Sequence, residues 1–189
     1  MDPLRALVER LDTEEPCTAA HGRATAQWCA RIASALRLSR DDVSYVSRCG
    51  LVHDVGKLYV PVNLIRAARA LDASEIAQVQ MHVIRGEEAL ALHPELFIYR
   101  DAVRWHHERY DGRGYPDGLR GERIPLAARI VAVADAYDAM TGQRPYRFPM
   151  TPDRALLEIE RGRGNQFDPE IADAMIRIVG DVVLRPVAV

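Results

Sequence analysis

Seven side chains that can bind metal ions lie on or beside the apolar faces of predicted helices. They are His21, His53, Asp54, His82, His106, His107 and Asp135. A single histidine on such a face is usually a hydrogen-bonded core residue. Five imidazoles and two carboxylates buried together would carry large desolvation and repulsion costs without a cation, whereas metal ions make the same groups satisfied ligands. The whole set therefore predicts a metal centre.

The types and the number of these ligands indicate which metal binds and how many ions there are. Imidazole with carboxylate, and without a pair of thiolates, suits iron, manganese or zinc. It disfavours a zinc site built from cysteines and a calcium site built from oxygens alone. The set exceeds the roughly three or four ligands of one catalytic zinc, and one carboxylate can bridge. We therefore expect two divalent ions, iron or manganese before zinc, with Asp54 as the bridge.

A pair of metal ions points to phosphate chemistry. Two ions about 3.5 to 4 Å apart activate a water for in-line attack at phosphorus and stabilise the charge on the phosphoryl oxygens. Phosphoester hydrolysis is therefore the expected reaction. Lys57, in the stretch HDVGK, can reach a phosphate oxygen as a point charge. A solvated surface lysine without a role fits the same position equally well.

Length, charge and cysteine content limit the class of protein. The chain has 189 residues, enough for one domain with a substantial core. Its net charge of -2 is not the basic footprint of a nucleic-acid-binding protein. Cys17, Cys29 and Cys49 form no C-x-x-C motif, which indicates free thiols. Because no signal peptide or apolar run of about 18 residues occurs, we expect a cytoplasmic protein with no nucleic-acid or membrane partner.

The ligand candidates follow a succession of predicted helices. Apolar residues recur at spacings of three and four with little alternation, which predicts an all-α fold. His21 lies on the apolar stripe of one such helix. Asp41 or Asp42 can cap the next helix, which carries His53. That helix is expected to end near Gly56.

Later helices are expected to carry the other candidates. A capping box of Asp72 and Glu75 begins the helix that carries His82. A shorter helix leads to His106 and His107. The dense glycines that follow argue against helix and indicate a loop.

The last part of the chain is predicted to be helical again. Pro125 occupies the first turn of a helix that carries Asp135. Two final helices are expected near 154–161 and 169–179. The chain then ends in an apolar stretch, 181–189.

Several longer stretches surround these candidates: H-G-R at 21–23, LVHDVGKLYVP at 51–61, His82, HHERYDGRGYPDGLRGERIPLAARIVAVADAYDAMT at 106–141, RPYR at 144–147 and GNQFDP at 164–169. Together they resemble the HD-GYP subgroup of the HD phosphohydrolase superfamily, whose members hydrolyse the bacterial second messenger cyclic di-GMP. HHE followed by DGxGYP is a long, spaced signal and far more specific than an HD dipeptide. The resemblance implies an HD-domain helical bundle with a glycine-rich GYP loop between helices.

The resemblance also implies a role for individual residues. It assigns to one ion His21, His53, Asp54 and Asp135. It assigns to the other ion Asp54, His82, His106 and His107. The residues that it implies in substrate binding are Lys57, Asp138, Arg144 and Arg147. Asp54 and Lys57 are the expected catalytic residues. The residues expected to shape the rim of the site are Gly114, Tyr115 and Pro116.

Two positions depart from the pattern of the subgroup. Residue 147 is Arg where a lysine is expected, which keeps the charge but alters the donor geometry. Four residues before His21, where some members carry a glutamate that helps to hold a third ion, this chain has Cys17. Glu14 and Glu15 lack the one-turn spacing that would replace this glutamate. We therefore expect two ions, and a Cys17 that is a small buried hydrophobe.

The expected reaction is hydrolysis of cyclic di-GMP to pGpG, with GMP as the product of a further cut, by attack of a hydroxide that bridges the two ions. Either a metal-bound water or Asp138 can protonate the leaving oxygen. One alternative is an HD phosphohydrolase for another cyclic dinucleotide, such as cyclic GMP-AMP. The other is a non-catalytic module whose GYP loop binds a diguanylate cyclase or another signalling regulator. The presence of all seven ligands favours the enzyme.

The domain organisation follows from the extent of these motifs. We expect a lead segment at 1–16, one HD-GYP metal-dependent phosphohydrolase domain at 17–180 and an apolar tail at 181–189.

Overall fold

Helices account for the regular structure of the described part of the chain. The computed structural model describes residues 2–143 and 148–183, and of residues 181–183 it describes only the backbone. Within these ranges there are ten α-helices, three short 3₁₀ helices (η1 to η3) and no strand. The all-α prediction is therefore confirmed.

The order of the helices is α1 (Pro3–Glu14), α2 (Pro16–Ala35), α3 (Arg40–Val52), η1 (Val55–Tyr59), α4 (Val62–Ile65), α5 (Ala73–Gln80), α6 (His82–Ala91), η2 (Pro94–Tyr99), α7 (Arg100–Trp105), η3 (Gly121–Arg123), α8 (Leu126–Thr141), α9 (Pro152–Gly162) and α10 (Pro169–Val183). The longest segment between two helices is the loop 106–120, which lies between α7 and η3.

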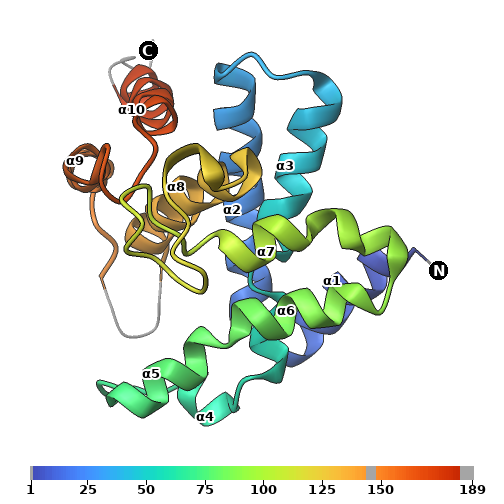
Figure 1. The fold of residues 1–189 in the computed structure, drawn as a ribbon. Coiled ribbons are helices and arrows are strands. Elements are labelled where there is room, and N and C mark those ends of the chain that lie inside the picture. The colour runs from blue at the N-terminus through green and yellow to red at the C-terminus, as the bar shows by residue number, and fades with distance from the viewer. Residues whose placement is uncertain (1, 144–147, 184–189) are drawn as a thin grey trace, which may run out of the picture.

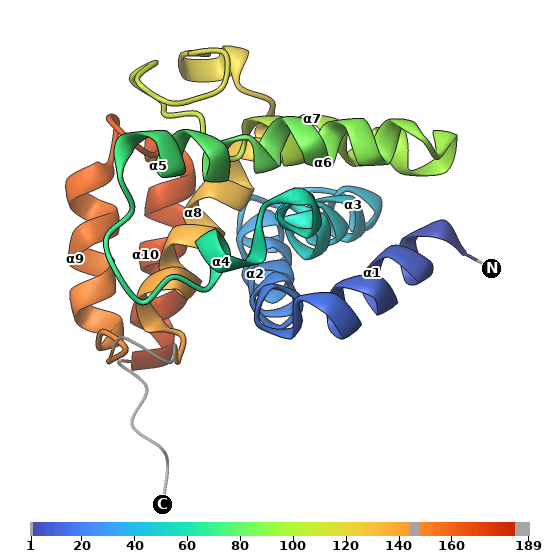
Figure 2. The same cartoon turned by 90° about the horizontal axis from the view of Figure 1, so that it is seen from below.

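Helix α2 lies at the centre of the bundle. It packs along α3 and contacts α8, which α9 and α10 cover from the other side (Figure 1). Helices α6 and α7 lie next to each other in a layer of their own, and α7 contacts both α3 and α8 (Figure 2). The core between these helices contains fully buried apolar side chains such as Ile32, Val52, Leu90, Ile130 and Met175. Helix α5, in contrast, buries no side chain.

The predicted lead segment at 1–16 contains a helix of the bundle. Asp2 caps α1, because its Oδ1 accepts a hydrogen bond from the Leu4 N–H at 3.0 Å. Leu11 is buried in the same hydrophobic core as residues of α2 and α8. Helix α1 therefore packs with the rest of the domain. At the other end, α10 extends to Val183, and 184–189 lie outside the described residues.

The cap of α3 differs from the prediction. Ser39, and not Asp41 or Asp42, is the N-cap residue, and its Oγ accepts a hydrogen bond from the Asp42 N–H at 3.1 Å. The two aspartates lie in the first turn, where their charge favours the helix dipole. Helix α3 ends at Val52, so that Gly56 belongs to η1.

The helix predicted to carry His82 is broken into two. The capping box is confirmed, since Asp72 and Glu75 each accept a hydrogen bond from the backbone N–H of the other. However, α5 ends at Gln80 and α6 begins at His82. The His82 Nδ1 atom donates to the Val79 carbonyl at 2.8 Å, an acceptor that an uninterrupted helix would use for a backbone N–H.

Helix α8 agrees with the prediction except at its start. Pro125 is its N-cap and not its first helical residue, and the helix ends at Thr141. No helix in the described ranges has both the length and the hydrophobicity needed to cross a membrane.

Candidate metal centre

Five segments of the chain bring the seven predicted ligands together. His21 comes from α2, and Asp135 from α8. His53 and Asp54 lie at the junction of α3 and η1. His82 begins α6, and the adjacent histidines His106 and His107 follow the end of α7. Each candidate lies at a helix end or on a helix face that packs against another segment.

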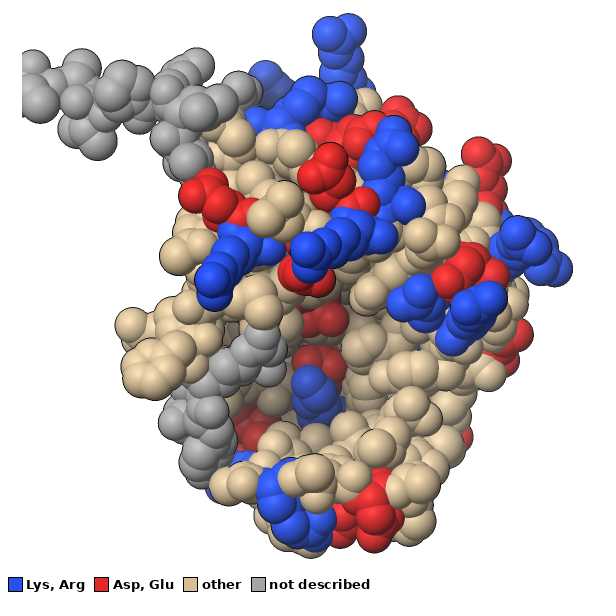
Figure 3. Space-filling model, turned by 90° about the vertical axis from the view of Figure 1, so that its left-hand side faces the viewer, with Lys and Arg blue, Asp and Glu red and all other residues tan. Residues whose placement is uncertain are grey.

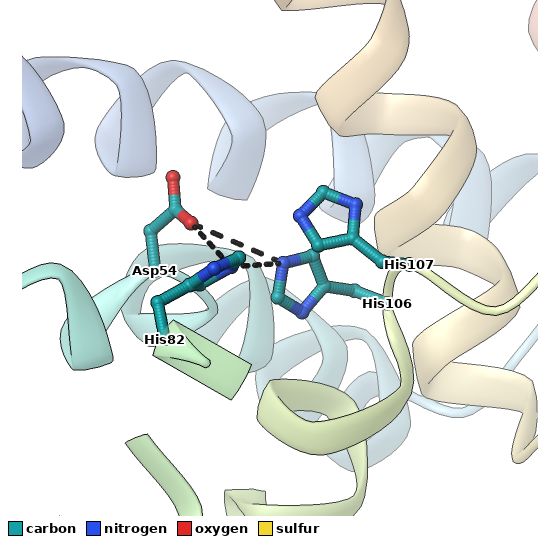
Figure 4. A group of neighbouring side chains, drawn as sticks. All are labelled: Asp54, His82, His106 and His107. Atoms are coloured by element: carbon teal, nitrogen blue, oxygen red, sulfur yellow. Dashed lines mark hydrogen bonds and ion pairs between the residues drawn. The ribbon is translucent and has the colours of Figure 1, made fainter. Parts of the chain in front are cut away.

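One group of ligands surrounds the Oδ1 atom of Asp54. Asp54, His82, His106 and His107 each offer a ligand atom within 4.8 Å of the others (Figure 4). Asp54 Oδ1 lies 3.3 Å from His82 Nε2 and 3.9 Å from His106 Nε2. These two imidazole nitrogens are 3.4 Å apart. The four side chains can therefore hold one ion.

A second group faces the other oxygen of the same carboxylate. His21, His53 and Asp54 also offer ligand atoms within 4.8 Å of one another. Asp54 Oδ2 lies 3.4 Å from His53 Nε2. Asp135 Oδ1 lies 2.8 Å from His21 Nε2 and 3.9 Å from His53 Nε2. Asp54 thus lies between two ligand groups, which is the position of a bridging carboxylate.

Four of the five imidazoles have their Nδ1 atom occupied by an acceptor outside the centre. Three donate to backbone carbonyls of the preceding turn: His53 to Gly50 at 2.7 Å, His82 to Val79 at 2.8 Å and His106 to Val103 at 2.9 Å. His21 Nδ1 lies 2.5 Å from Asp138 Oδ2. Each of these hydrogen bonds leaves Nε2 as the nitrogen available to a metal ion.

Two atoms of the centre are buried without a hydrogen-bond partner among the described residues. They are His53 Nε2 and Asp54 Oδ1. A buried polar atom without a partner normally destabilises the folded state. Both atoms carry lone pairs directed into the centre, so a cation is the partner that both would accept. The residues present therefore fit divalent metal ions.

The electrostatic environment gives the ligands the protonation states that metal binding requires. Burial lowers the pKa of His82 and of His106, and it lowers that of His107 to about 4. Burial opposes the ionisation of Asp54, but the charge of Lys57 and the contact with His53 hold its pKa well below the usual range. At neutral pH these imidazoles are neutral and this carboxylate is charged.

His21 is the exception in the metal-free protein. Burial lowers its pKa, but hydrogen bonds to Asp135 and Asp138 outweigh burial and raise it to about 9. His21 is therefore protonated at neutral pH and must lose a proton before Nε2 can bind a metal ion.

The predicted substrate residues lie close to the metal ligands where they are described. The ammonium of Lys57 pairs with Asp54 Oδ2, and the Lys57 side chain is 24% exposed. Asp138 contacts His21, a partner that the motif alone did not reveal. Arg144 and Arg147 lie outside the described residues. The face seen in Figure 3 is hollowed, with acidic and basic side chains on the floor of the hollow.

The GYP loop packs directly against the histidine pair. Gly114 lies so close to the backbone of His107 and Glu108 that a Cβ there would come within 2.6 Å of the His107 carbonyl oxygen. The ring of Tyr115 stacks on that of His107, and the peptide bond to Pro116 is cis. Together with Asp135 and neighbouring residues, this loop lines a cavity of about 210 Å³.

Cys17 and Glu108, two residues near the metal centre, differ in their burial. Cys17 is exposed, so its expected burial is wrong: its position in the first turn of α2 faces solvent. Glu108 is buried, and its Oε1 accepts a hydrogen bond from the Asp117 N–H at 2.7 Å, so this side chain stabilises the start of the loop.

Comparison with known proteins supports the same interpretation. The HD-domain family profile matches residues 5–171. The chain is 42% identical over 148 residues to the cyclic di-GMP phosphodiesterase response regulator RpfG of Xanthomonas campestris, an alignment that covers 77% of this chain and 39% of RpfG. It is 32% identical to the 3'3'-cGAMP-specific phosphodiesterase 2 of Vibrio cholerae, covering 84% of this chain and 31% of that protein. The chain thus spans less than half of the length of these relatives.

A solved structure shows the same fold. Bd1817, an HDG"Y"P protein from Bdellovibrio bacteriovorus, superposes with a TM-score of 0.70 at 19% identity, over 93% of this chain and 57% of that one. With the profile match over most of the sequence, the chain belongs to the HD-domain family, as its HD-GYP motifs predicted.

Proposed function

We propose that the chain is a metal-dependent phosphodiesterase that hydrolyses cyclic di-GMP to pGpG, with GMP as the product of a further cut. The observation that carries this proposal is the position of Asp54, whose two carboxylate oxygens face two separate groups of ligands. The first ion would be held by His21, His53, Asp54 and Asp135. The second would be held by Asp54, His82, His106 and His107. Imidazole and carboxylate ligands favour iron or manganese, with zinc as the next candidate.

The two ions, when bound, supply a nucleophilic oxygen at neutral pH and stabilise charge on the phosphoryl group. The chain's own residues prepare the site for this. Asp54 and Asp135 hold negative charge where the ions bind. Once Nε2 has lost its proton, Asp138 would hold His21 in one tautomer through the 2.5 Å contact to Nδ1. Lys57, partly exposed beside Asp54, is placed to bind a phosphate oxygen, and we assign the same role to Arg144 and Arg147 on the RPYR motif.

A second substrate has a specific observation in its favour. Relatives named for cyclic di-GMP and relatives named for 3'3'-cGAMP both match this chain, the latter at 32% to 37% identity. The metal ligands of this chain would serve either dinucleotide. The choice between them depends on contacts to the bases.

The GYP loop also offers a surface for a protein partner. Arg113, Asp117, Gly118 and Arg120 are exposed on it. We propose that a diguanylate cyclase or another signalling regulator binds there. We also place the protein in the cytoplasm, because its three cysteines are free thiols, which is typical of reducing compartments.

The decisive experiment combines metal analysis with hydrolysis assays on cyclic di-GMP and 3'3'-cGAMP. Wild type is expected to hold two ions per chain and to prefer cyclic di-GMP. His82→Ala is expected to lose an ion and about 100-fold or more in rate, because charge stabilisation by a metal amounts to several kcal/mol. His93→Ala is the matched control, since His93 is exposed and outside the centre.

Three outcomes distinguish the alternatives. Two bound ions without hydrolysis of either dinucleotide would support a non-catalytic module. Faster hydrolysis of 3'3'-cGAMP than of cyclic di-GMP would contradict the proposed substrate but leave the proposed mechanism unchanged. Equal activity of His82→Ala and His93→Ala would contradict the metal centre itself.

A further inference from the structure

His107 differs from the other imidazoles of the centre in what orients its ring. His21, His53, His82 and His106 each have an acceptor at Nδ1. His107 makes no side-chain hydrogen bond with the described residues. Its ring instead faces the ring of Tyr115, with centroids 4.9 Å apart and an interplanar angle of 24°. The rings of His82 and His106 also contact His107, but at interplanar angles of 81° and 43°. Tyr115 is the ring that stacks on the face of this imidazole and can fix its plane.

The loop holds Tyr115 in place through contacts on both sides of it. Before it, Gly114 packs on the backbone of Glu108 and His107 at distances that leave no room for a Cβ. At Tyr115 itself, the backbone N–H donates to the His107 carbonyl at 3.3 Å. After it, the Asp117 N–H donates to the buried carboxylate of Glu108 at 2.7 Å. The stacking ring is therefore anchored to the same short segment that carries His107.

We propose that Tyr115 is a positioning residue for the metal centre, which acts by holding the ring of His107 in the orientation that binds the second ion. The inference rests on the proposed two-metal function. It gives the tyrosine of the GYP motif the task that hydrogen bonds perform for the other four imidazoles. The task belongs to the ring, because the Tyr115 hydroxyl makes no hydrogen bond with the described residues.

The test is a titration of the metal-free protein with Mn²⁺ in which the heat of binding is measured by calorimetry. Wild type is expected to bind two equivalents. Tyr115→Leu keeps an apolar side chain but removes the aromatic ring, and the weaker of its two sites is expected to lose about 10- to 100-fold in affinity, the usual effect of removing an orienting partner. Tyr115→Phe is expected to bind both ions as wild type does. Tyr110→Leu is the matched control, since Tyr110 lies in the same loop but lines a different cavity, which no histidine lines.

The failure of this inference is distinct from failure of the proposed function. A wild-type protein that binds no Mn²⁺ would contradict the metal centre. Two equivalents in wild type with equal affinities in Tyr115→Leu would contradict only the role of Tyr115. Equal losses in Tyr115→Phe or in Tyr110→Leu would also overturn it, because the ring would not then be responsible.

A second measurement detects a folding defect. Histidine ring signals of the metal-free protein, recorded by NMR with ¹⁵N-labelled histidine, report each imidazole separately. Tyr115→Leu is expected to shift the His107 ring signals and to leave those of His21, on the far side of the centre, unchanged. Changes throughout the histidine signals, or none at His107, would overturn the proposal.

Discussion

The protonation state of each imidazole decides whether it must lose a proton before it can bind a metal ion. His82, His106 and His107 are neutral at pH 7, because burial lowers the pKa of each. These imidazoles need no proton removed before they bind a metal ion. His21, whose pKa lies at about 9, does. On the proposed function, the side of the centre that contains His21 would therefore bind metal in exchange for a proton, whereas the other side would need no proton removed at neutral pH.

Thiol reactivity tests the burial of single residues. Cys29 and Cys49 have no exposed surface. Burial raises the pKa of both thiols, and that of Cys49 to about 12, so neither forms the reactive thiolate at pH 8. Cys17 is exposed. One thiol per chain is expected to react rapidly with Ellman's reagent in the native protein, and three in denaturant.

Cys17→Ser provides the control for this measurement. It is expected to abolish the rapid reaction and to leave the two slow thiols unchanged. Rapid reaction of a second thiol in the native protein would show that the contact between α2 and α3 opens more readily than the packing indicates.

The types of the ligands were predictable from sequence, but their partners were not. The buried imidazoles and carboxylates are unusual enough, as a set, to indicate metal binding. The contact of His21 with Asp138 joins residues 117 positions apart, and it depends on the direction of both side chains across two helices. Similarly, HHE and GYP were visible as motifs, while the stacking of Tyr115 on His107 required the fold of the loop.

At the scale of elements, the contact between η1 and α6 sets the distance across the centre. Asp54 precedes η1 and His82 begins α6. Gly56 lies so close to α6 that a Cβ would come within 1.8 Å of the His82 carbonyl oxygen. Backbone atoms cannot yield as a flexible side chain does. The glycine therefore keeps Asp54 Oδ1 within 3.3 Å of His82 Nε2.

Two alanine substitutions at glycines are expected to have opposite effects on stability. Gly56→Ala should lower the free energy of unfolding by about 1 to 3 kcal/mol, as overpacking does, and weaken Mn²⁺ binding by separating η1 from α6. A Cβ added at Gly180, inside α10, would meet no atom of the described residues within 4 Å. Gly180→Ala should therefore raise stability by about 0.5 to 1 kcal/mol, the gain from lower backbone entropy in the unfolded state.

Urea unfolding of both variants measures these changes. Metal binding should be unaffected in Gly180→Ala, which separates the local effect at η1 from a general effect of stability. If Gly56→Ala were as stable as wild type, α6 would have to move away from η1 without any loss in the free energy of unfolding, which would contradict this account of the contact.

The periodicity of apolar residues predicted where helices occur better than it predicted where each helix begins and ends. Most helices occur where the apolar spacing places them. The break at Met81 was not visible, because it depends on the His82 ring donating to Val79. Nor was α1 expected as part of the bundle, since its contribution to the core rests mainly on Leu11. Helix caps could be predicted only to within a few residues. The sequence indicated Asp41 or Asp42 as the cap of α3, whereas the N-cap is Ser39.

For the whole molecule, the centre joins parts of the chain that are far apart in sequence. Its ligands extend from His21 in α2 to Asp135 in α8, so every ligand helix must be in place before both groups are complete. Without an ion, the fold buries His53 Nε2 and Asp54 Oδ1 without partners among the described residues. A bound ion would satisfy these atoms only in the folded state. Metal binding and folding are therefore coupled.

This coupling predicts that metal ions stabilise the protein against heat. Free Mn²⁺ at about 100 times its dissociation constant adds about 2.7 kcal/mol per site to the folded state. For a chain of 189 residues this corresponds to a rise in Tm of about 5 to 10 °C, measurable by circular dichroism after dialysis against a chelator. His82→Ala should lose much of the rise and His93→Ala should keep it. Ca²⁺, which prefers oxygen ligands, should produce a smaller shift. The Mn²⁺ effect should shrink as the pH falls below about 9, where His21 of the metal-free protein gains a proton, and again toward pH 4, where His107 gains one. If His82→Ala gained as much as wild type, the ion that stabilises the fold would have to bind elsewhere.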